Sequence, residues 1–499
     1  MGRVRLLPTL LAALSVLFVA CVEDDDPPDL FLPLPTATAS ATTVPATPTP
    51  AASTPLSDAG VLALMRDAVC WYDDPSMAAD CLPPQAATVE AIEAMGASRD
   101  PRLIAPLIDM RWLAVGWARW IEDALEVLTG RRLNDPAAWY AWAATQELRL
   151  PPGYIGWKGR LLSFIDPRYA ELLRDDREYE LRPELLIWSR AAPNEVEPLR
   201  DPPLVHRVEE RYLSGDDVVY GLLLNGESRA YPRRIVAWHE IIEEEVGDEP
   251  VVIAFCRPCG GAVAFDPRVG EERYTLGASG LIHDSRSLLF DEETGSLWDP
   301  LSGRPVAGPL LDEGIELARY PLLTATWGDW SDRHHATFTL DLNTGHVRDY
   351  SPGAGLGSEA ESDVPQYPIV AIDDRLPAEE RIVGVVIEGE ARAYPASLLR
   401  SREAVHDNVG GTAIVLLSEG AGAAIRIYHA AGLEVTGLSE DDRDLIANGD
   451  DGSDGTRWFV QEDALVSTED GRRYSSLPGD ELYWFAWAQM HPQTTIWGQ

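Results

Sequence analysis

The chain has 499 residues, of which 45% are hydrophobic and 24% are charged, and its formal net charge at pH 7 is −40. A surface with this charge repels phosphate backbones, so nucleic acid is not expected as a partner. At about 100 to 200 residues per domain, the length predicts about three folded domains. The expected fold class is α+β, with a helical N-terminal domain followed by two tandem, strand-rich domains that are related as repeats.

The first segment, residues 1–21, has the pattern of a lipoprotein-type signal peptide. Two arginines precede an apolar run that ends at Ala20, immediately before Cys21. In bacterial export signals of this kind the cysteine thiol is lipidated and becomes the mature N-terminus. Phe18 stands where leucine is usual, so plain secretion is the alternative. The apolar run is too short to span a bilayer comfortably, which takes about 20 residues. We therefore expect a protein of the cell envelope, outside the cytoplasm, that is anchored to the membrane through a lipid on Cys21.

Residues 22–56 form the predicted tether between this signal and the folded part of the chain. A short acidic stretch is followed by a segment dominated by Pro, Thr and Ala. Such a composition cannot bury enough apolar surface to offset the entropy lost on ordering, and its prolines keep it extended. The expected location outside the cytoplasm is one where disulfides persist.

Residues 57–200 form the predicted helical domain. Apolar residues recur there at spacings of three and four, as in Ala87–Met95, with Asp and Pro between such segments. This pattern indicates short packed helices. The segment Ser98–Met110 resembles the helical turn of HEAT-type repeats. Cys70 and Cys81 are expected to form a structural disulfide, and two buried free thiols are the alternative.

The rest of the chain contains an internal repeat. Val218–Pro232 (VVYGLLLNGESRAYP) matches Ile382–Pro395 (IVGVVIEGEARAYP), and the match continues at a constant offset of 163 residues. The repeat predicts two related β-rich domains, residues 201–346 and 369–499, joined by a linker at residues 347–368.

Features kept in both copies are explained by a shared fold. Gly226 and Gly389 each lie between two strand-like segments, so both are expected in hairpin turns. His334 and His491 each follow a pair of tryptophans. A structural, hydrogen-bonded role is therefore expected for both histidines.

Cys256, Cys259 and His239 belong to the first copy alone. The aligned positions of the second copy hold Glu419, Gly422 and Arg402. Since the second copy folds without these side chains, a shared fold does not explain them. They are the candidate site.

Two thiols separated by two residues can close a disulfide, exchange with other thiols or bind a soft metal ion. The strand Val251–Phe255 leads into the pair, so a strand-turn-strand arrangement is expected. A thioredoxin-like site would open a helix instead, so activation of a thiol would have to come from Arg257 or a protonated His239.

Copper is the metal that the cysteine pair favours. Two thiolates and one imidazole suit copper(I), and His239 is the expected third ligand, with His283 in reserve. Zinc is less favoured, because a structural zinc site usually needs a second pair of ligands. No phosphate-binding loop, serine nucleophile elbow or HExxH motif occurs in the sequence.

Several long motifs resemble one known family. GLLLNGESRAYP, AWHEIIEEEVGDEPVVIAFCRPCGGAVAFD, GASGLIHDSRSLLFDEETGSLWDPLSGRPVAGP and WGDW occur in the order typical of the family called domain of unknown function 3179. The resemblance covers about residues 201–499 and implies no established activity. Gly260–Gly261 departs mildly from that family's pattern, and His283 stands where an aromatic residue is usual.

Two functions from different classes follow from these patterns. The leading expectation is thiol redox chemistry or soft-metal binding at Cys256, Cys259 and His239. The alternative is a non-catalytic binding or scaffold module of the cell envelope in which the cysteine pair is a structural disulfide. The sequence does not decide whether the protein is an enzyme, and it identifies no substrate, electron donor or protein partner.

Overall fold

The computed structural model describes residues 55–76, 85–113, 116–355, 365, 367–369, 372–418, 424–438, 444–448 and 455–499. Residues 53–499 form one compact unit. The predicted signal peptide with Cys21, nearly all of the tether, and Cys81 lie outside the described residues. Within the described ranges, no helix has both the length and the apolar character needed to cross a membrane.

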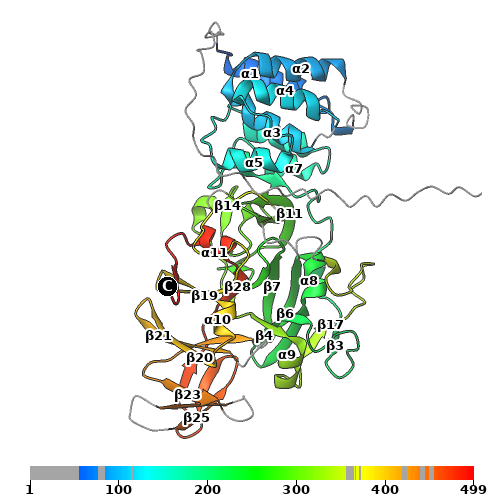
Figure 1. The fold of residues 1–499 in the computed structure, drawn as a ribbon. Helices are drawn as coiled ribbons and strands as arrows, with labels where there is room; N and C mark the ends of the chain where they lie inside the picture. The colour runs from blue at the N-terminus through cyan, green and yellow to red at the C-terminus, as the bar shows by residue number, and fades with distance from the viewer. Residues whose placement is uncertain are drawn as a thin grey trace, which may run out of the picture. The chain divides into compact units, whose positions relative to one another are not determined.

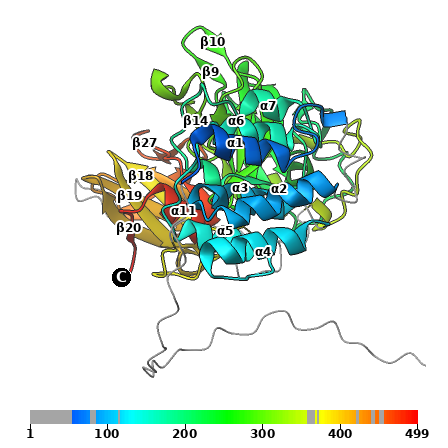
Figure 2. The same cartoon turned by 90° about the horizontal axis from the view of Figure 1, so that it is seen from above.

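The N-terminal part is helical, as the sequence predicts, and Figures 1 and 2 show its blue and cyan helices in one group. The helices are α1 (Asp58–Asp67), α2 (Ala86–Ala97), η2 (Pro101–Leu103), α3 (Ile104–Leu113), α4 (Ala118–Thr129), α5 (Pro136–Ala144), α6 (Tyr154–Leu162), α7 (Arg168–Leu172) and η3 (Pro183–Leu185). Ser57 caps α1 by accepting a hydrogen bond from the Gly60 amide. The resemblance to HEAT-type repeats stays a prediction.

The helical core is built from large side chains and one buried ion pair. Trp117, Trp139 and Trp157 are fully buried. Lys158 Nζ lies 2.8 Å from Asp109 Oδ1, and both side chains are 3% exposed. Aromatic packing therefore accounts for the tryptophan-rich composition of this region.

The first β-rich repeat, together with the short strands β1 and β2 that precede it in the chain, forms three five-stranded sheets. Their strand orders are β1-β11-β12-β13-β14, β15-β8-β7-β6-β2 and β16-β4-β5-β17-β3. The strands are β1 (Ile187–Trp188), β2 (Leu199–Arg200), β3 (Leu204–His206), β4 (Val218–Leu224), β5 (Glu227–Pro232), β6 (Ile241–Val246), β7 (Glu249–Cys256), β8 (Gly261–Phe265), β11 (Leu276–His283), β12 (Arg286–Asp291), β13 (Leu297–Trp298), β14 (Pro305–Ala307), β15 (Arg319–Tyr320), β16 (Leu323–Thr326) and β17 (Phe338–Leu340). The strands β9 (Arg268–Val269) and β10 (Glu272–Arg273) form a separate ribbon, and the helices are α8 (Arg233–His239), η4 (Leu311–Glu313) and α9 (Trp327–Arg333).

The second repeat contains the sheets β28-β18-β19-β29, β20-β21-β22 and β23-β24-β25-β26-β27. Its strands are β18 (Arg381–Ile387), β19 (Glu390–Pro395), β20 (Ala404–Val409), β21 (Thr412–Ser418), β22 (Ile425–His429), β23 (Glu434–Leu438), β24 (Asp444–Asn448), β25 (Thr456–Val460), β26 (Ala464–Ser467), β27 (Arg473–Ser475), β28 (Asp480–Tyr483) and β29 (Thr495–Ile496). Its helices are α10 (Ala396–Leu399) and α11 (Trp484–Met490). Helices followed by strand-rich sheets confirm the α+β class.

The repeats share one strand arrangement. The order β16-β4-β5-β17 in the first copy corresponds to β28-β18-β19-β29 in the second, and the last pair is parallel in both. Both hairpins turn through two residues with positive φ, Asn225–Gly226 and Glu388–Gly389. This is the backbone of a type I′ turn, which matches the twist of the strands it joins.

A glycine and a tryptophan make the same close contact in each copy. A Cβ atom added to Gly221 would lie 2.2 Å from the ring of Trp330, and one added to Gly384 would lie 2.3 Å from the ring of Trp487. Each indole also donates to a threonine hydroxyl, 3.0 Å away in the first copy and 2.9 Å in the second. Glycine is needed at both positions because the tryptophan ring fills the space of a side chain.

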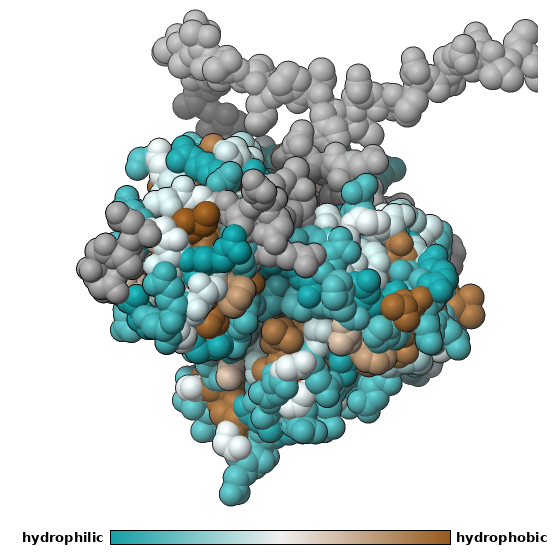
Figure 3. Space-filling view, turned by 90° about the horizontal axis from the view of Figure 1, so that it is seen from below, coloured by the Kyte–Doolittle hydropathy of each residue, from teal (hydrophilic) through white to brown (hydrophobic). Residues whose placement is uncertain are grey.

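The face drawn in Figure 3 is largely hydrophilic, with apolar side chains in small separate groups. Among the described residues, the most exposed large apolar side chains are Val347, Ile372 and Val208. Isolated exposed apolar residues are normal on soluble proteins and do not by themselves mark an interface.

Candidate functional site

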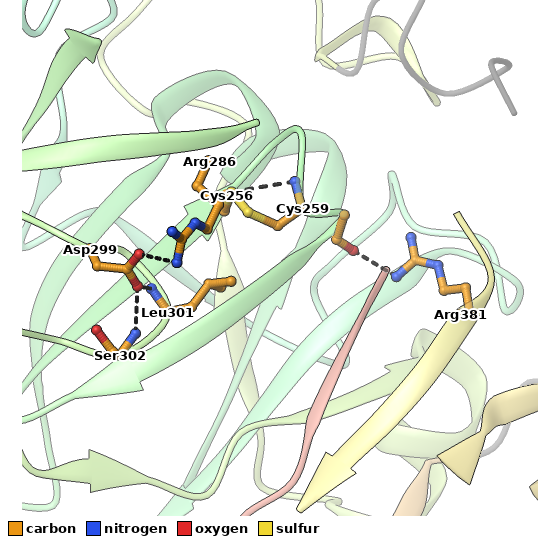
Figure 4. Close-up of a disulfide and its surroundings, with 8 residues drawn as sticks. Cys256, Cys259, Arg286, Asp299, Leu301, Ser302 and Arg381 are labelled. Atoms are coloured by element: carbon orange, nitrogen blue, oxygen red, sulfur yellow. Dashed lines mark hydrogen bonds and ion pairs between the residues drawn. A yellow bond between two sulfur atoms is a disulfide. The ribbon is translucent and has the colours of Figure 1, made fainter. Parts of the chain in front are cut away.

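The cysteine pair lies on the strand-turn-strand segment that the sequence predicts. Strand β7 ends at Cys256 and β8 begins at Gly261. Cys256 and Cys259 are joined by a disulfide, with Cα atoms 5.1 Å apart (Figure 4). Gly260, with φ of 72°, donates its amide to the Cys256 carbonyl at 3.0 Å and closes the turn. Both cysteines are 0% exposed, so the bridge is sealed from solvent.

A buried ion pair accompanies the disulfide. In Figure 4, Arg286 is drawn among the residues around the disulfide, and its guanidinium reaches Asp299. Arg286 Nη1 is 2.6 Å from Asp299 Oδ2, while the other carboxylate oxygen accepts the amides of Leu301 and Ser302. The Cys259 amide donates to Cys256 Sγ at 3.3 Å. This amide donor favours a thiolate, so Cys256 is the sulfur whose negative charge the turn would stabilise after reduction.

His239 lies at the end of α8, with both ring nitrogens hydrogen-bonded. Nδ1 donates to the Glu197 carbonyl at 2.7 Å, and Nε2 accepts from the Tyr350 hydroxyl at 2.7 Å. Burial lowers the pKa of His239 to about 4. At neutral pH this imidazole is therefore uncharged and cannot supply the positive charge that the sequence suggested for activating a thiol.

His283, the predicted reserve ligand, is the last residue of β11. It lies at the tip of the β11–β12 hairpin, which the sequence did not predict. Its Nδ1 lies 3.3 Å from Asp284 Oδ2, and burial lowers its pKa while Asp284 opposes that shift. Asp284 and Ser285 both have positive φ, at 51° and 56°, although neither is glycine. Three buried atoms here have no hydrogen-bond partner among the described residues: His283 Nε2, Ser285 Oγ and Arg286 Nε. The sequence signal for this strained turn was the pair Asp284-Ser285, a two-residue turn between strands that contains no glycine.

The predicted copper ligands do not form an assembled metal site. No group of three or more His, Cys, Asp or Glu side chains that could hold a metal ion occurs in the part of the chain that the structure describes. The sulfurs are bonded to each other, and both nitrogens of His239 have protein partners. Copper or zinc binding at Cys256, Cys259, His239 and His283 stays a prediction that this geometry does not support.

The other predicted cysteine sites are only partly described. Cys70 packs against the helical core. Its predicted partner Cys81 and the predicted lipidation site Cys21 lie outside the described residues. The disulfide and the lipid anchor therefore stay predictions.

A pocket of about 320 Å³ opens beside the cysteine turn. Its lining includes Trp238, Glu240, Arg257, Pro258, Ser287 and Tyr367. Arg257 and Pro258 are the two residues between the cysteines. Arg257 Nη2 donates to the Ala237 carbonyl at 2.9 Å and to Glu240 at 3.2 Å, while its buried Nε has no partner in the part of the chain that the structure describes.

Glu240 shows two signs of an unusual environment beside this pocket. Its φ is 59°, in the left-handed region that non-glycine residues rarely adopt. Burial raises the pKa of its carboxyl, and the Arg257 guanidinium opposes that shift. Strained backbone and perturbed titration cluster at functional sites, so the pocket is the second candidate feature of this region.

The model of one protein family matches residues 196–494, which is more than half of the chain. That family is described as a protein of unknown function, DUF3179. The chain belongs to this family. The match confirms the family resemblance, and it includes both β-rich repeats, the cysteine turn and most of the pocket lining. No curated protein and no solved structure matched the chain.

Proposed function

We propose that this DUF3179 protein is a non-catalytic binding protein of the cell envelope, in which the Cys256–Cys259 bridge is structural and the adjacent pocket binds a small carboxylate-bearing ligand. One observation carries the proposal. The cysteine turn seals both sulfurs inside the protein and presents Arg257 and Pro258 to the pocket. Thiol exchange requires access to a sulfur, whereas ligand binding requires access to the pocket.

The size and chemistry of the pocket support a small ligand. A volume of about 320 Å³ is within the range of roughly 300 to 1,000 Å³ that is usual for ligand sites. Arg257 Nε is a buried donor with no acceptor on any described residue. Buried donors are nearly always satisfied, and a carboxylate oxygen is the strongest acceptor for a guanidinium N–H.

The binding test compares charged and neutral probes. Acetate and succinate, with acetamide and succinamide as neutral counterparts, would be titrated into the protein and followed by ligand-observed NMR. We expect the carboxylates to bind, and Arg257→Met to weaken them at least tenfold. Arg304→Met is the matched control, because Arg304 pairs with Glu316 on the surface, away from the pocket lining. Equal binding by wild type and Arg257→Met would refute the proposal.

The proposed location is tested separately. Lipidation of Cys21 would anchor the protein to the membrane through the tether at residues 22–56. We expect the wild-type chain in the membrane fraction as a lipid-modified species. The Cys21→Ala variant should give no lipid-modified species in that fraction. A wild-type protein that is recovered unlipidated would favour plain secretion.

Thiol redox chemistry is the second candidate, and the contacts of Cys256 favour it. The Cys259 amide would stabilise a Cys256 thiolate. If this chemistry operates, a dithiol should reduce the Cys256–Cys259 bridge in the folded protein. A bridge that resists dithiols until the protein unfolds would exclude this candidate.

A further inference from the structure

We propose that the Cys256–Cys259 disulfide is a redox-sensitive latch that holds the second repeat against the first. The latch is the turn from Cys256 to Gly261, and the docked segment is β28 with α11, residues 480–490. This inference does not depend on ligand binding in the pocket. Because both sulfurs are 0% exposed, it requires a local opening of the turn in the folded protein that admits a dithiol.

Backbone contacts join the latch to the docked segment and to the neighbouring strand β18. The Tyr483 amide donates to the Cys259 carbonyl at 3.0 Å. Arg381, at the start of β18, donates from Nη1 to the Gly260 carbonyl at 2.6 Å, and its guanidinium lies 4.7 Å from the centre of the Tyr483 ring. Both carbonyls belong to the turn that the disulfide closes, so their positions depend on the shape of that turn.

Glycine makes this approach possible. A Cβ atom on Gly260 would lie 2.4 Å from the Tyr483 ring, and one on Gly261 would lie 2.5 Å from the Glu481 carbonyl oxygen. The second repeat therefore lies directly against the turn, with no room for a side chain between them.

The sulfurs share a hydrophobic core with the docked segment. Cys256 and Cys259 belong to the same buried cluster as Leu482, Trp484 and Phe485 of the second repeat. Protein interiors are close-packed, so a change at the sulfurs is felt by these neighbours.

Reduction changes this core and the turn together. A dithiol transfers two electrons and two protons to the bridge: the S–S bond breaks, Cys256 and Cys259 become thiols, and the reductant becomes a disulfide. Two thiols add hydrogens in a packed core, and the turn loses its covalent closure. The carbonyls of Cys259 and Gly260 are then free to leave their partners on the second repeat.

The same two repeats make a reciprocal contact that contains no sulfur, and it supplies an internal control. Ala424, which aligns with Gly261, donates its amide to Asp329 of α9 at 3.3 Å. Arg426, just beyond it, has its Nη2 3.7 Å from Asp329 Oδ2. A redox latch should loosen residues 480–490 and leave α9 unchanged.

The test is hydrogen exchange of the full-length protein with and without dithiothreitol, with the state of each cysteine read by alkylation and mass spectrometry. We expect reduction of Cys256 and Cys259 to accelerate amide exchange in residues 480–490 at least tenfold, while α9, Trp327–Arg333, changes less than twofold. Because Arg381 holds the latch, Arg381→Met should also speed reduction of the bridge. Arg402→Met, which removes a guanidinium placed over Trp497, is the matched control and should not.

The double variant Cys256→Ser with Cys259→Ser should exchange rapidly at residues 480–490 without reductant and should not respond to it. This insensitivity separates the latch from any effect of reductant on other cysteines. Reduced wild type with unchanged exchange at residues 480–490 would overturn the proposal. A bridge that dithiothreitol does not reduce in the folded protein would overturn it too, and both results come from the wild type alone.

Discussion

The two contacts between the repeats use equivalent elements and different chemistry. The first copy offers the disulfide turn to β28 and α11, through backbone carbonyls and an apolar core. The second copy offers the segment around Ala424 to α9, through buried charges on Arg426, Glu462 and Asp329. The same strand arrangement therefore forms either the disulfide contact or the charged contact, so the fold alone does not require the cysteines.

The charged contact is the one whose loss should cost most. Glu462 accepts from Arg426 and lies 3.0 Å from His334 Nε2, and the Arg426 side chain is 2% exposed. Glu462→Gln removes the nearer of the two carboxylates around that cation and leaves Asp329 at 3.7 Å, so we expect a loss of about 3 kcal/mol in unfolding free energy. Chemical denaturation of the wild type and the variant measures this loss of unfolding free energy. A loss below about 1 kcal/mol would show that the contact is effectively solvated.

The same carboxylate predicts a pH dependence. Burial opposes its ionisation, but Arg426 lowers the pKa of Glu462 far below its ordinary value of 4.5. Because the folded pKa is depressed, its stabilisation is complete above pH 4.5 and is lost progressively as the pH falls below that value. Glu462→Gln should remove this part of the acid dependence.

His239, which only the first copy has, should destabilise that copy in mild acid. Burial lowers its pKa to about 4, whereas the unfolded value is about 6.5. Between these values the unfolded chain binds a proton that the folded chain does not, so stability falls as the pH drops from about 6.5 to 4, by about 3 kcal/mol in total. We expect His239→Gln to flatten the stability curve in this window. An unchanged slope would assign the acid sensitivity to other groups.

Particular residues show what the sequence could and could not predict. The hairpins at Gly226 and Gly389 followed from alternating strand patterns around a turn signal. The contact of Gly221 with Trp330 joins residues over a hundred positions apart, so no local sequence pattern predicts it. His239 was expected near the thiols because it precedes the strand that ends at Cys256, yet its ring nitrogens are held by Glu197 and Tyr350. Such partners depend on tertiary packing, which spacing along the chain does not encode.

The shared core contact predicts equal effects in the two copies. An alanine methyl at Gly221 or at Gly384 would meet a tryptophan ring within 2.3 Å. We expect each substitution to cost about 1–3 kcal/mol, since overpacking forces the ring or the backbone to move. Thermal denaturation of the two single variants, with Gly226 and Gly389 left unchanged, gives the comparison. A large effect in one copy alone would mean that the repeats differ in how their cores adapt.

The hairpin turns should give the smallest effect, and one of opposite sign. Asn225 and Glu388 occupy the same position, with φ of 49° and 50°. Asparagine tolerates the left-handed region better than glutamate, and Asn-Gly is the preferred pair for a type I′ turn. Asn225 also donates its side-chain amide to the Gly247 carbonyl at 2.8 Å. The second copy has Gly410 at the position of Gly247, so Glu388→Asn would recreate this turn and should stabilise the protein by about 0.5–1 kcal/mol.

The control is the reverse change, Asn225→Glu, which should destabilise the protein by a similar or larger amount because it also removes the hydrogen bond to Gly247. If Glu388→Asn is neutral or harmful, the two turns are equivalent in backbone but not in surroundings, and the likeness of the repeats ends at their strands.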